Sequence, residues 1–128
     1  MSIDTQRLGE LGERIAERWL RRRGWRVLAR RFRSGHRDID LVMERDGVVA
    51  FVEVKTRRGA EFGDPVEAVH WRKQRELIRS AFVWLDRCGR GQRQAEQAFR
   101  FDVVGVLLQG ERVRVRHVEN AFGLSWKG

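Results

Sequence analysis

Cysteine is almost missing from this chain of 128 residues, in which Cys88 is the single example. One thiol can form neither an intramolecular disulfide nor a cysteine-based zinc site, so both are excluded. Long apolar runs are missing too, and none approaches the roughly 20 residues that a membrane-spanning helix needs. The first ten residues are polar and carry Asp4 and Glu10, unlike a secretory signal. We therefore expect a cytoplasmic protein with no membrane partner.

Lysine is scarce as well, although the chain is strongly basic. It contains 24 arginines but three lysines (Lys55, Lys73 and Lys127), and its formal net charge is +9. Such a charge on a small domain favours a polyanionic partner, and we expect nucleic acid, above all DNA. An arginine-rich proteome is the alternative explanation. Because arginine is the default cation here, a lysine beside acidic residues indicates a specific role: its ammonium is a compact point charge, whereas guanidinium is a planar fork.

The length of the chain predicts one domain over residues 1–128. Hydrophobic residues make up 41% of it, which is enough for one core. Asp64 and Glu67 flank Pro65 in a capping-box pattern, which marks the start of a second helix. Helices are expected over 5–23 and 64–85, and strands over 25–32, 38–44, 48–55, 99–108 and 113–118. The order αβββαββ predicts an α/β domain with a mixed central sheet flanked by helices.

The dipeptide Asp46-Gly47 is typical of a two-residue hairpin turn and fixes the register of the two strands beside it. With Arg45 opposite Val48, counting back places Asp40 opposite Glu53. Strand side chains alternate, so Ile39, Leu41 and Met43 should share one face of the sheet. The residues expected on the other face are Asp38, Asp40, Glu53 and Lys55.

Two carboxylates in this arrangement would repel, because directly opposed Cβ atoms lie about 4.5–5.5 Å apart. A shared proton, a basic neighbour or a divalent cation can offset the repulsion. Lys55, diagonal to Asp40, supplies one positive charge, and a hard cation such as Mg²⁺ would use the carboxylate oxygens directly. A simple cross-strand ion network is the alternative that the spacing leaves open.

The segment Phe51-Val52-Glu53-Val54-Lys55, with Asp40 upstream, resembles the Asp, Glu-x-Lys signature of the PD-(D/E)XK nuclease superfamily. Nearly the whole chain resembles the YraN-like family, which comprises small bacterial proteins with an endonuclease-like fold similar to archaeal Holliday junction resolvases. The motifs that carry this resemblance are Gly9-x-x-Gly12-Glu13-x-x-Ala16, Asp38-Ile39-Asp40-Leu41, Phe62-Gly63-Asp64-Pro65, Lys73 and Arg100-Phe101-Asp102-Val103-Val104. Where the family usually has Gly-Glu before Ile-Asp, this chain has Arg37-Asp38, so no role is assigned to Asp38.

The resemblance implies a restriction-endonuclease-like fold and Mg²⁺- or Mn²⁺-dependent hydrolysis of phosphodiester bonds in branched, nicked or single-stranded DNA. It implies that Asp40, Glu53 and the Val54 carbonyl bind the metal. Lys55 would position the attacking water or stabilise charge on the phosphate. Glu13 would complete the site from the first helix, where small neighbours permit close approach; an ordinary solvated glutamate is the alternative.

Basic and aromatic residues are candidates for contacts with nucleic acid. The expected phosphate contacts are Lys73, Arg72, Arg30, Arg31, Arg57 and Arg58. Trp25, Trp71 and Trp126 lie off the apolar helical faces and could stack on bases, although core packing is the alternative. Two other classes of function stay open, namely a binding module of the same fold without catalysis and a basic adaptor for a protein partner. A homodimer is open as well.

Overall fold

A computed structural model describes residues 4–35, 37–59, 63–88 and 98–123 of the chain. Its elements follow the predicted order αβββαββ, with one additional 3-10 turn, η1, before the second helix. They are α1 (Thr5–Arg21), β1 (Arg26–Ser34), β2 (Arg37–Arg45), β3 (Val48–Arg58), η1 (Pro65–Ala68), α2 (Trp71–Arg87), β4 (Ala98–Gln109) and β5 (Arg112–Phe122). None of the described helices is long and apolar enough to cross a membrane.

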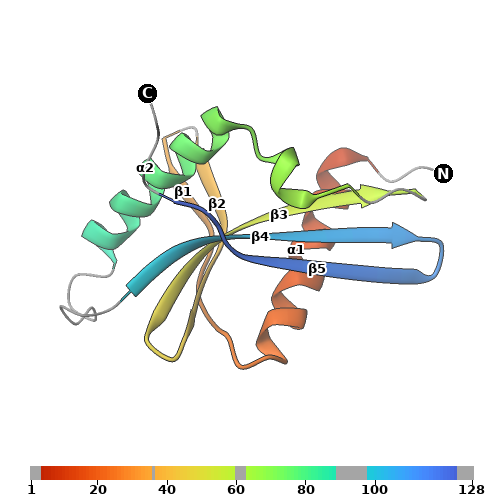
Figure 1. Ribbon diagram of the computed structural model, residues 1–128, viewed down its shortest axis with the longest axis horizontal. Coiled ribbons are helices and arrows are strands. Elements are labelled where there is room, and N and C mark those ends of the chain that lie inside the picture. Colours follow the sequence, from red (N-terminus) through yellow and green to blue (C-terminus); the bar gives the residue numbers. More distant parts are fainter. Residues whose placement is uncertain (1–3, 36, 60–62, 89–97, 124–128) are drawn as a thin grey trace.

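The strands form one five-stranded mixed sheet in the order β1-β2-β3-β4-β5 (Figure 1). Only β3 and β4 are parallel, and α2 provides the crossover between them; the other neighbours are antiparallel. Two apolar clusters lie on the sheet, one formed with Leu77 and Ala81 of α2 and one with Ala16 and Leu20 of α1. The structure thus confirms a mixed α/β domain with helices flanking a central sheet.

Helix α1 approaches β3 very closely at Gly12. The buried residues of α1 are Gly12, Ala16 and Leu20, four residues apart, which places them on one side of the helix. A Cβ atom at Gly12 would lie 1.7 Å from Oγ1 of Thr56 and 2.8 Å from its Cβ. Glycine is therefore the residue that lets the helix lie against the strand.

The second helix begins later than the capping-box pattern predicts. The Asp64 carboxylate accepts a hydrogen bond from the N–H of Val66 at 2.9 Å, but it caps only η1. The backbone is extended at Val69, whose side chain is buried beneath α2. His70 then caps α2 by accepting a hydrogen bond from the Arg72 N–H at 3.3 Å. Because the extended backbone at Val69 separates η1 from α2, the prediction of a single helix from residue 64 is wrong.

The tryptophans divide between core and surface. Trp84 and Trp25 are buried, whereas Trp19 is half-buried against the cluster beneath α1. The expectation that Trp25 could be exposed is therefore wrong. Trp71 is 52% exposed, as that expectation allowed. Trp126 lies outside the described residues.

Candidate active site

The hairpin turn is the one that the sequence predicts, and so is the register of the five residue pairs nearest to it. Asp46 and Gly47 both have positive φ angles, 50° and 78°, as a tight primed turn requires. Pairing runs from Arg45 opposite Val48 to Leu41 opposite Val52, and there the ladder between the described strands ends. In Figure 1, β1 and β2 continue to the top of the view while β3, β4 and β5 turn to the right. The two parts of the sheet diverge at the position of Asp40 and Glu53.

Side chains no longer alternate simply where the strands diverge. Leu41 and Met43 lie in the cluster beneath α1, but Ile39 lies in the cluster beneath α2, so the prediction of one shared face is wrong. Arg31, in the adjoining strand between the residues that pair with Ile39 and Leu41, has a φ of 45°. This unusual angle accompanies the twist of the strand pair at Asp40.

The Asp40 carboxylate lies where β2 and β3 separate, beyond the pair of Leu41 and Val52; we call this place the opening. Its Oδ2 accepts a hydrogen bond from the Val54 N–H at 2.8 Å, in place of the missing ladder bond. Burial, the adjacent negative charge of Glu53 and a hydrogen bond between the two carboxyl groups raise the pKa of Asp40 from 3.8 to about 8; the Val54 N–H opposes the rise. Asp40 and Glu53 are therefore neighbours, as the register predicts, and the raised pKa keeps Asp40 largely protonated at neutral pH.

Two lysines lie beside the buried carboxylate of Glu53, which is 4% exposed. Nζ of Lys55 is 3.5 Å from Oε2 of Glu53, and Nζ of Lys73 is 3.9 Å from the same oxygen. Lys55 comes from the same strand, whereas Lys73 comes from the first turn of α2. The sequence suggested Lys73 only as a phosphate contact; its place beside Glu53 depends on how α2 packs.

The oxygen atoms in this opening fit a hard divalent cation. Oε1 of Glu53 is buried and has no hydrogen-bond partner among the described residues. The Val54 N–H points at Asp40, and the carbonyl of a strand residue points to the same side as its N–H. The part of the chain that the structure describes has no group of three His, Cys, Asp or Glu side chains arranged around a metal position. Two carboxylates and one carbonyl suit Mg²⁺, which usually keeps several waters.

Glu13 lies on the far side of the same opening. A pocket of about 430 Å³ is lined by Glu13 and Asp40, together with Glu10, Glu17, Arg30 and Arg31. Burial raises the pKa of Glu13; the Arg31 hydrogen bond opposes this, and the charge of Asp40 adds to it. Nε of Arg31 donates to Oε1 of Glu13 at 2.9 Å. The structure thus brings Glu13 towards Asp40 rather than leaving it in open solvent.

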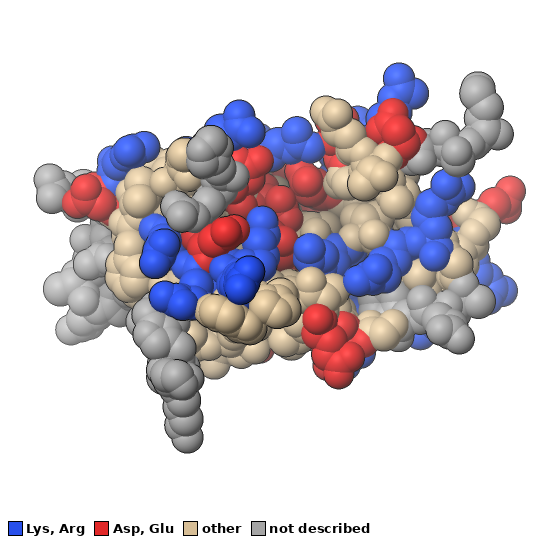
Figure 2. All heavy atoms as spheres, turned by 90° about the horizontal axis from the view of Figure 1, so that it is seen from above, with Lys and Arg blue, Asp and Glu red and all other residues tan. Residues whose placement is uncertain are grey.

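The arginines proposed as phosphate contacts are of two kinds. Arg30 and Arg31 are ion-paired with α1, through Glu17 at 2.6 Å and Glu13 at 2.9 Å respectively. Arg57, Arg58 and Arg72 are exposed on the end of β3 and the start of α2. Figure 2 shows acidic side chains gathered in the middle of one face, with basic side chains on both sides. This face therefore has an acidic centre with basic regions on both sides.

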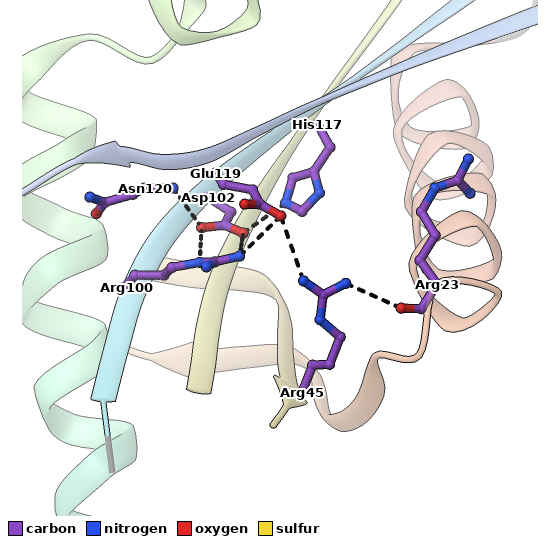
Figure 3. A network of polar contacts seen from close by, with 7 residues as sticks. All are labelled: Arg23, Arg45, Arg100, Asp102, His117, Glu119 and Asn120. Atoms are coloured by element: carbon purple, nitrogen blue, oxygen red, sulfur yellow. Dashed lines mark hydrogen bonds and ion pairs between the residues drawn. The ribbon is translucent and has the colours of Figure 1, made fainter. Parts of the chain in front are cut away.

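Asp102 forms a second polar cluster, which the sequence did not explain (Figure 3). It is fully buried, 2.7 Å from Nε2 of His117 and 3.0 Å from Nε of Arg100, and its Oδ1 accepts the Asn120 N–H at 3.0 Å. Burial alone would raise the pKa of Asp102, but the hydrogen bonds from His117 and Arg100 lower it below its usual value. The contacts of His117 and Asn120 with Asp102 join β5 to β4 at the irregularity after Phe101.

Comparison with known proteins identifies the relatives of this chain. The model of the family described as "Uncharacterised protein family UPF0102" matches residues 12–106. The chain belongs to the UPF0102 family. A UPF0102 protein of Trichlorobacter lovleyi is 42% identical over 124 residues, which cover 95% of this chain and 94% of the relative. A UPF0102 protein of Symbiobacterium thermophilum is 46% identical over 121 residues, covering 92% and 98%.

Membership of UPF0102 confirms the predicted resemblance to a family of small bacterial proteins. The matched range contains the residues of the opening, which are Glu13, Asp40, Glu53, Val54, Lys55 and Lys73. The restriction-endonuclease-like fold, the metal and the residue roles remain predictions, because family membership alone assigns none of them.

Proposed function

We propose that this protein is a metal-dependent nuclease that hydrolyses phosphodiester bonds in DNA. The observation that carries the proposal is the contact between Asp40 and Glu53 in the opening of the sheet, with Lys55 3.5 Å from Glu53. Asp40 has a raised pKa, and Oε1 of Glu53 is buried without a hydrogen-bond partner among the described residues; both are costly for stability alone. Such a cost is typical of sites arranged for chemistry.

Asp40, Glu53 and the Val54 carbonyl would hold Mg²⁺ or Mn²⁺. The bound ion would act as a Lewis acid on the phosphate and as a template for water. The Val54 N–H fixes the orientation of Asp40 through Oδ2. Binding requires that the proton leave Asp40, because only the ionised carboxylate is a good ligand.

Lys55 and Lys73 would act on the phosphate side of the site. Both ammonium groups lie within 4 Å of one Glu53 oxygen, so they offset its charge and retain further N–H donors. Lys55 would position the attacking water or stabilise charge that develops on the phosphate. Lys73 would contact a neighbouring phosphate, together with exposed Arg57 and Arg58. These roles use the ammonium as a compact donor, which a planar guanidinium does not reproduce.

A nucleic-acid-binding module without catalysis is the second candidate. The observation that favours it is the raised pKa of Asp40, about 8, which keeps this ligand protonated at neutral pH when no metal is bound. The two candidates differ in what added Mn²⁺ does. A nuclease should cut DNA when Mn²⁺ is supplied, whereas a binding module should retain DNA without cutting it.

The test is cleavage of a panel of branched, nicked and single-stranded DNA by the wild type and three variants, in Mn²⁺ and in EDTA. Glu53→Gln should abolish metal-dependent cleavage. Lys55→Arg should lower the rate at least about tenfold, a loss of about 1.4 kcal/mol of transition-state stabilisation, while folding and DNA binding are kept. Asp38→Asn is the matched control, because Asp38 lies on the same strand but pairs with Arg33 at 3.2 Å; it should cut normally.

Two results would count against the proposal. If no DNA in the panel is cut by the wild type in Mn²⁺, the binding module becomes the better reading. If Lys55→Arg cuts at the wild-type rate while Glu53→Gln is inactive, Lys55 only balances charge.

A further inference from the structure

Trp71 exposes an aromatic surface that the fold does not use. Its side chain is 52% exposed in the first turn of α2, whereas Trp25 and Trp84 are 4% and 5% exposed. An exposed tryptophan beside a functional site is typical of a surface that stacks on a ligand, because it is rigid and leaves much apolar area in water.

Two guanidinium groups lie near the Trp71 ring. The guanidinium carbons of Arg72 and Arg75 lie 5.6 Å and 5.5 Å from its centroid. Arg79, one turn further along α2, lines a surface pocket with these three residues and Glu76. We name Trp71, Arg72, Arg75 and Arg79 the tryptophan platform. An aromatic face flanked by guanidinium groups matches a nucleobase that stacks and phosphates that need neutralising.

The tryptophan platform lies close to the candidate active site. Lys73, two residues after Trp71, reaches Glu53 at 3.9 Å. Residues two apart on a helix point in different directions, and the helix is about 10 Å across, so a strand of a few nucleotides spans the distance. In a duplex the faces of interior bases are covered by stacking, so an internal base can meet Trp71 only where the strand is unpaired.

We propose that the tryptophan platform binds an unpaired base and its flanking phosphates, and so directs single-stranded DNA into the candidate active site. The inference rests on the proposed function for the kind of polymer that is bound. It selects one substrate class from those that the site chemistry allows, namely strands with unpaired nucleotides. Charge complementarity argues for this occupant over an apolar protein surface, because two arginines flank the ring and a third lines the pocket beside it.

The experiment measures binding, not cleavage. Fluorescence anisotropy in EDTA compares a labelled single strand with the blunt duplex of the same sequence. Trp71→Ala should weaken binding of the single strand about tenfold, or about 1.4 kcal/mol, and change duplex binding less than about twofold. Trp71→Phe, which keeps an aromatic face, should restore most of the affinity.

Phe82 provides the matched control. It is 48% exposed on the same helix, 11 residues after Trp71, or about 16 Å along the axis, and its ring packs against Phe99. Phe82→Ala should leave both affinities unchanged. Equal losses for single strand and duplex, or equal losses in Phe82→Ala and Trp71→Ala, would overturn the proposal.

Sedimentation velocity at the binding concentrations tests the remaining occupant. If wild type self-associates and Trp71→Ala does not, a second copy of the chain covers Trp71, and the proposal fails. Because EDTA prevents metal-dependent cleavage, the outcome does not depend on the nuclease assay. If Trp71→Ala selectively loses single-strand binding and the wild type cuts no DNA in Mn²⁺, the platform is supported and the nuclease proposal fails. If the wild type cuts DNA in Mn²⁺ but Trp71→Ala does not change binding, the nuclease is supported and the platform is overturned.

Discussion

Replacing Asp40 by asparagine should make the metal-free protein more stable at neutral pH. Burial and the charge of Glu53 raise the pKa of Asp40 from 3.8 to about 8. Asparagine keeps an acceptor for the Val54 N–H and supplies a donor to Glu53, so the change removes the ionisation and little else. The same substitution should weaken metal binding, because a neutral amide replaces a charged ligand.

The direction follows from proton linkage. Above about pH 4 the unfolded chain releases the Asp40 proton, but the folded chain keeps it until about pH 8. Between these values each pH unit lowers the free energy of unfolding by about 1.4 kcal/mol relative to a group that does not titrate. At pH 7 the largest gain in the free energy of unfolding that Asp40→Asn can give is therefore about 4 kcal/mol. Because Asp40 is half-buried, so that solvent screens part of the charge, we expect a smaller gain of about 1–3 kcal/mol.

The assay is urea unfolding in EDTA at pH 5, 7 and 8.5, with Asp38→Asn as the control. The advantage of Asp40→Asn should grow from pH 5 to pH 8 and then level off. Added Mn²⁺ should stabilise the wild type, by about 2.7 kcal/mol at a hundred times its dissociation constant, but not the variant. A variant less stable than wild type at pH 7, or an advantage independent of pH, would refute the reasoning.

Three further predictions concern packing, the buried network and the charged surface. Gly12→Ala should lower the free energy of unfolding by about 1–2 kcal/mol, since the new Cβ would lie 1.7 Å from Thr56 Oγ1. Gly9→Ala, which meets nothing within 4 Å, should be neutral or stabilise α1 by up to about 1 kcal/mol; equal effects in urea titrations would contradict the close approach. Asp102→Ala should cost about 2–4 kcal/mol, because Arg100 and His117 lose a buried acceptor, and a loss below about 1 kcal/mol would show that the network is dispensable. DNA affinity should fall at least about tenfold between 50 and 200 mM salt, as anisotropy can measure; a flat response would argue for the protein adaptor instead.

Local features of the sequence determined much of this protein. The Asp46-Gly47 turn sets the hairpin register without help from the rest of the chain, because a two-residue loop allows one pairing of its strands. That register points towards Asp40 and Glu53 as neighbours, although the ladder itself ends one pair earlier, at Leu41 and Val52. Periodicity likewise gave the order of helices and strands, since a buried face repeats every 3.6 residues in a helix and every two in a strand.

Only the tertiary structure decided how distant elements meet at the opening. The strands part at Asp40, Arg31 adopts a positive φ opposite it, and Ile39 enters the other cluster. The backbone is extended at the buried Val69, α2 begins only at Trp71, and Lys73 in its first turn lies 3.9 Å from Glu53. No pattern within either segment encodes such contacts, because they depend on the distance and angle between packed elements.

The same reason explains three residues whose surroundings the sequence left open. Trp25 and Trp71 have similar basic neighbours in the sequence, yet Trp25 is buried against His117 of β5 and Trp71 faces solvent. Asp102 reads as a lone charge in an apolar strand until β5 brings His117 to 2.7 Å. Local geometry fixed which residues could pair along a hairpin, whereas burial depended on which surfaces the completed sheet and helices cover.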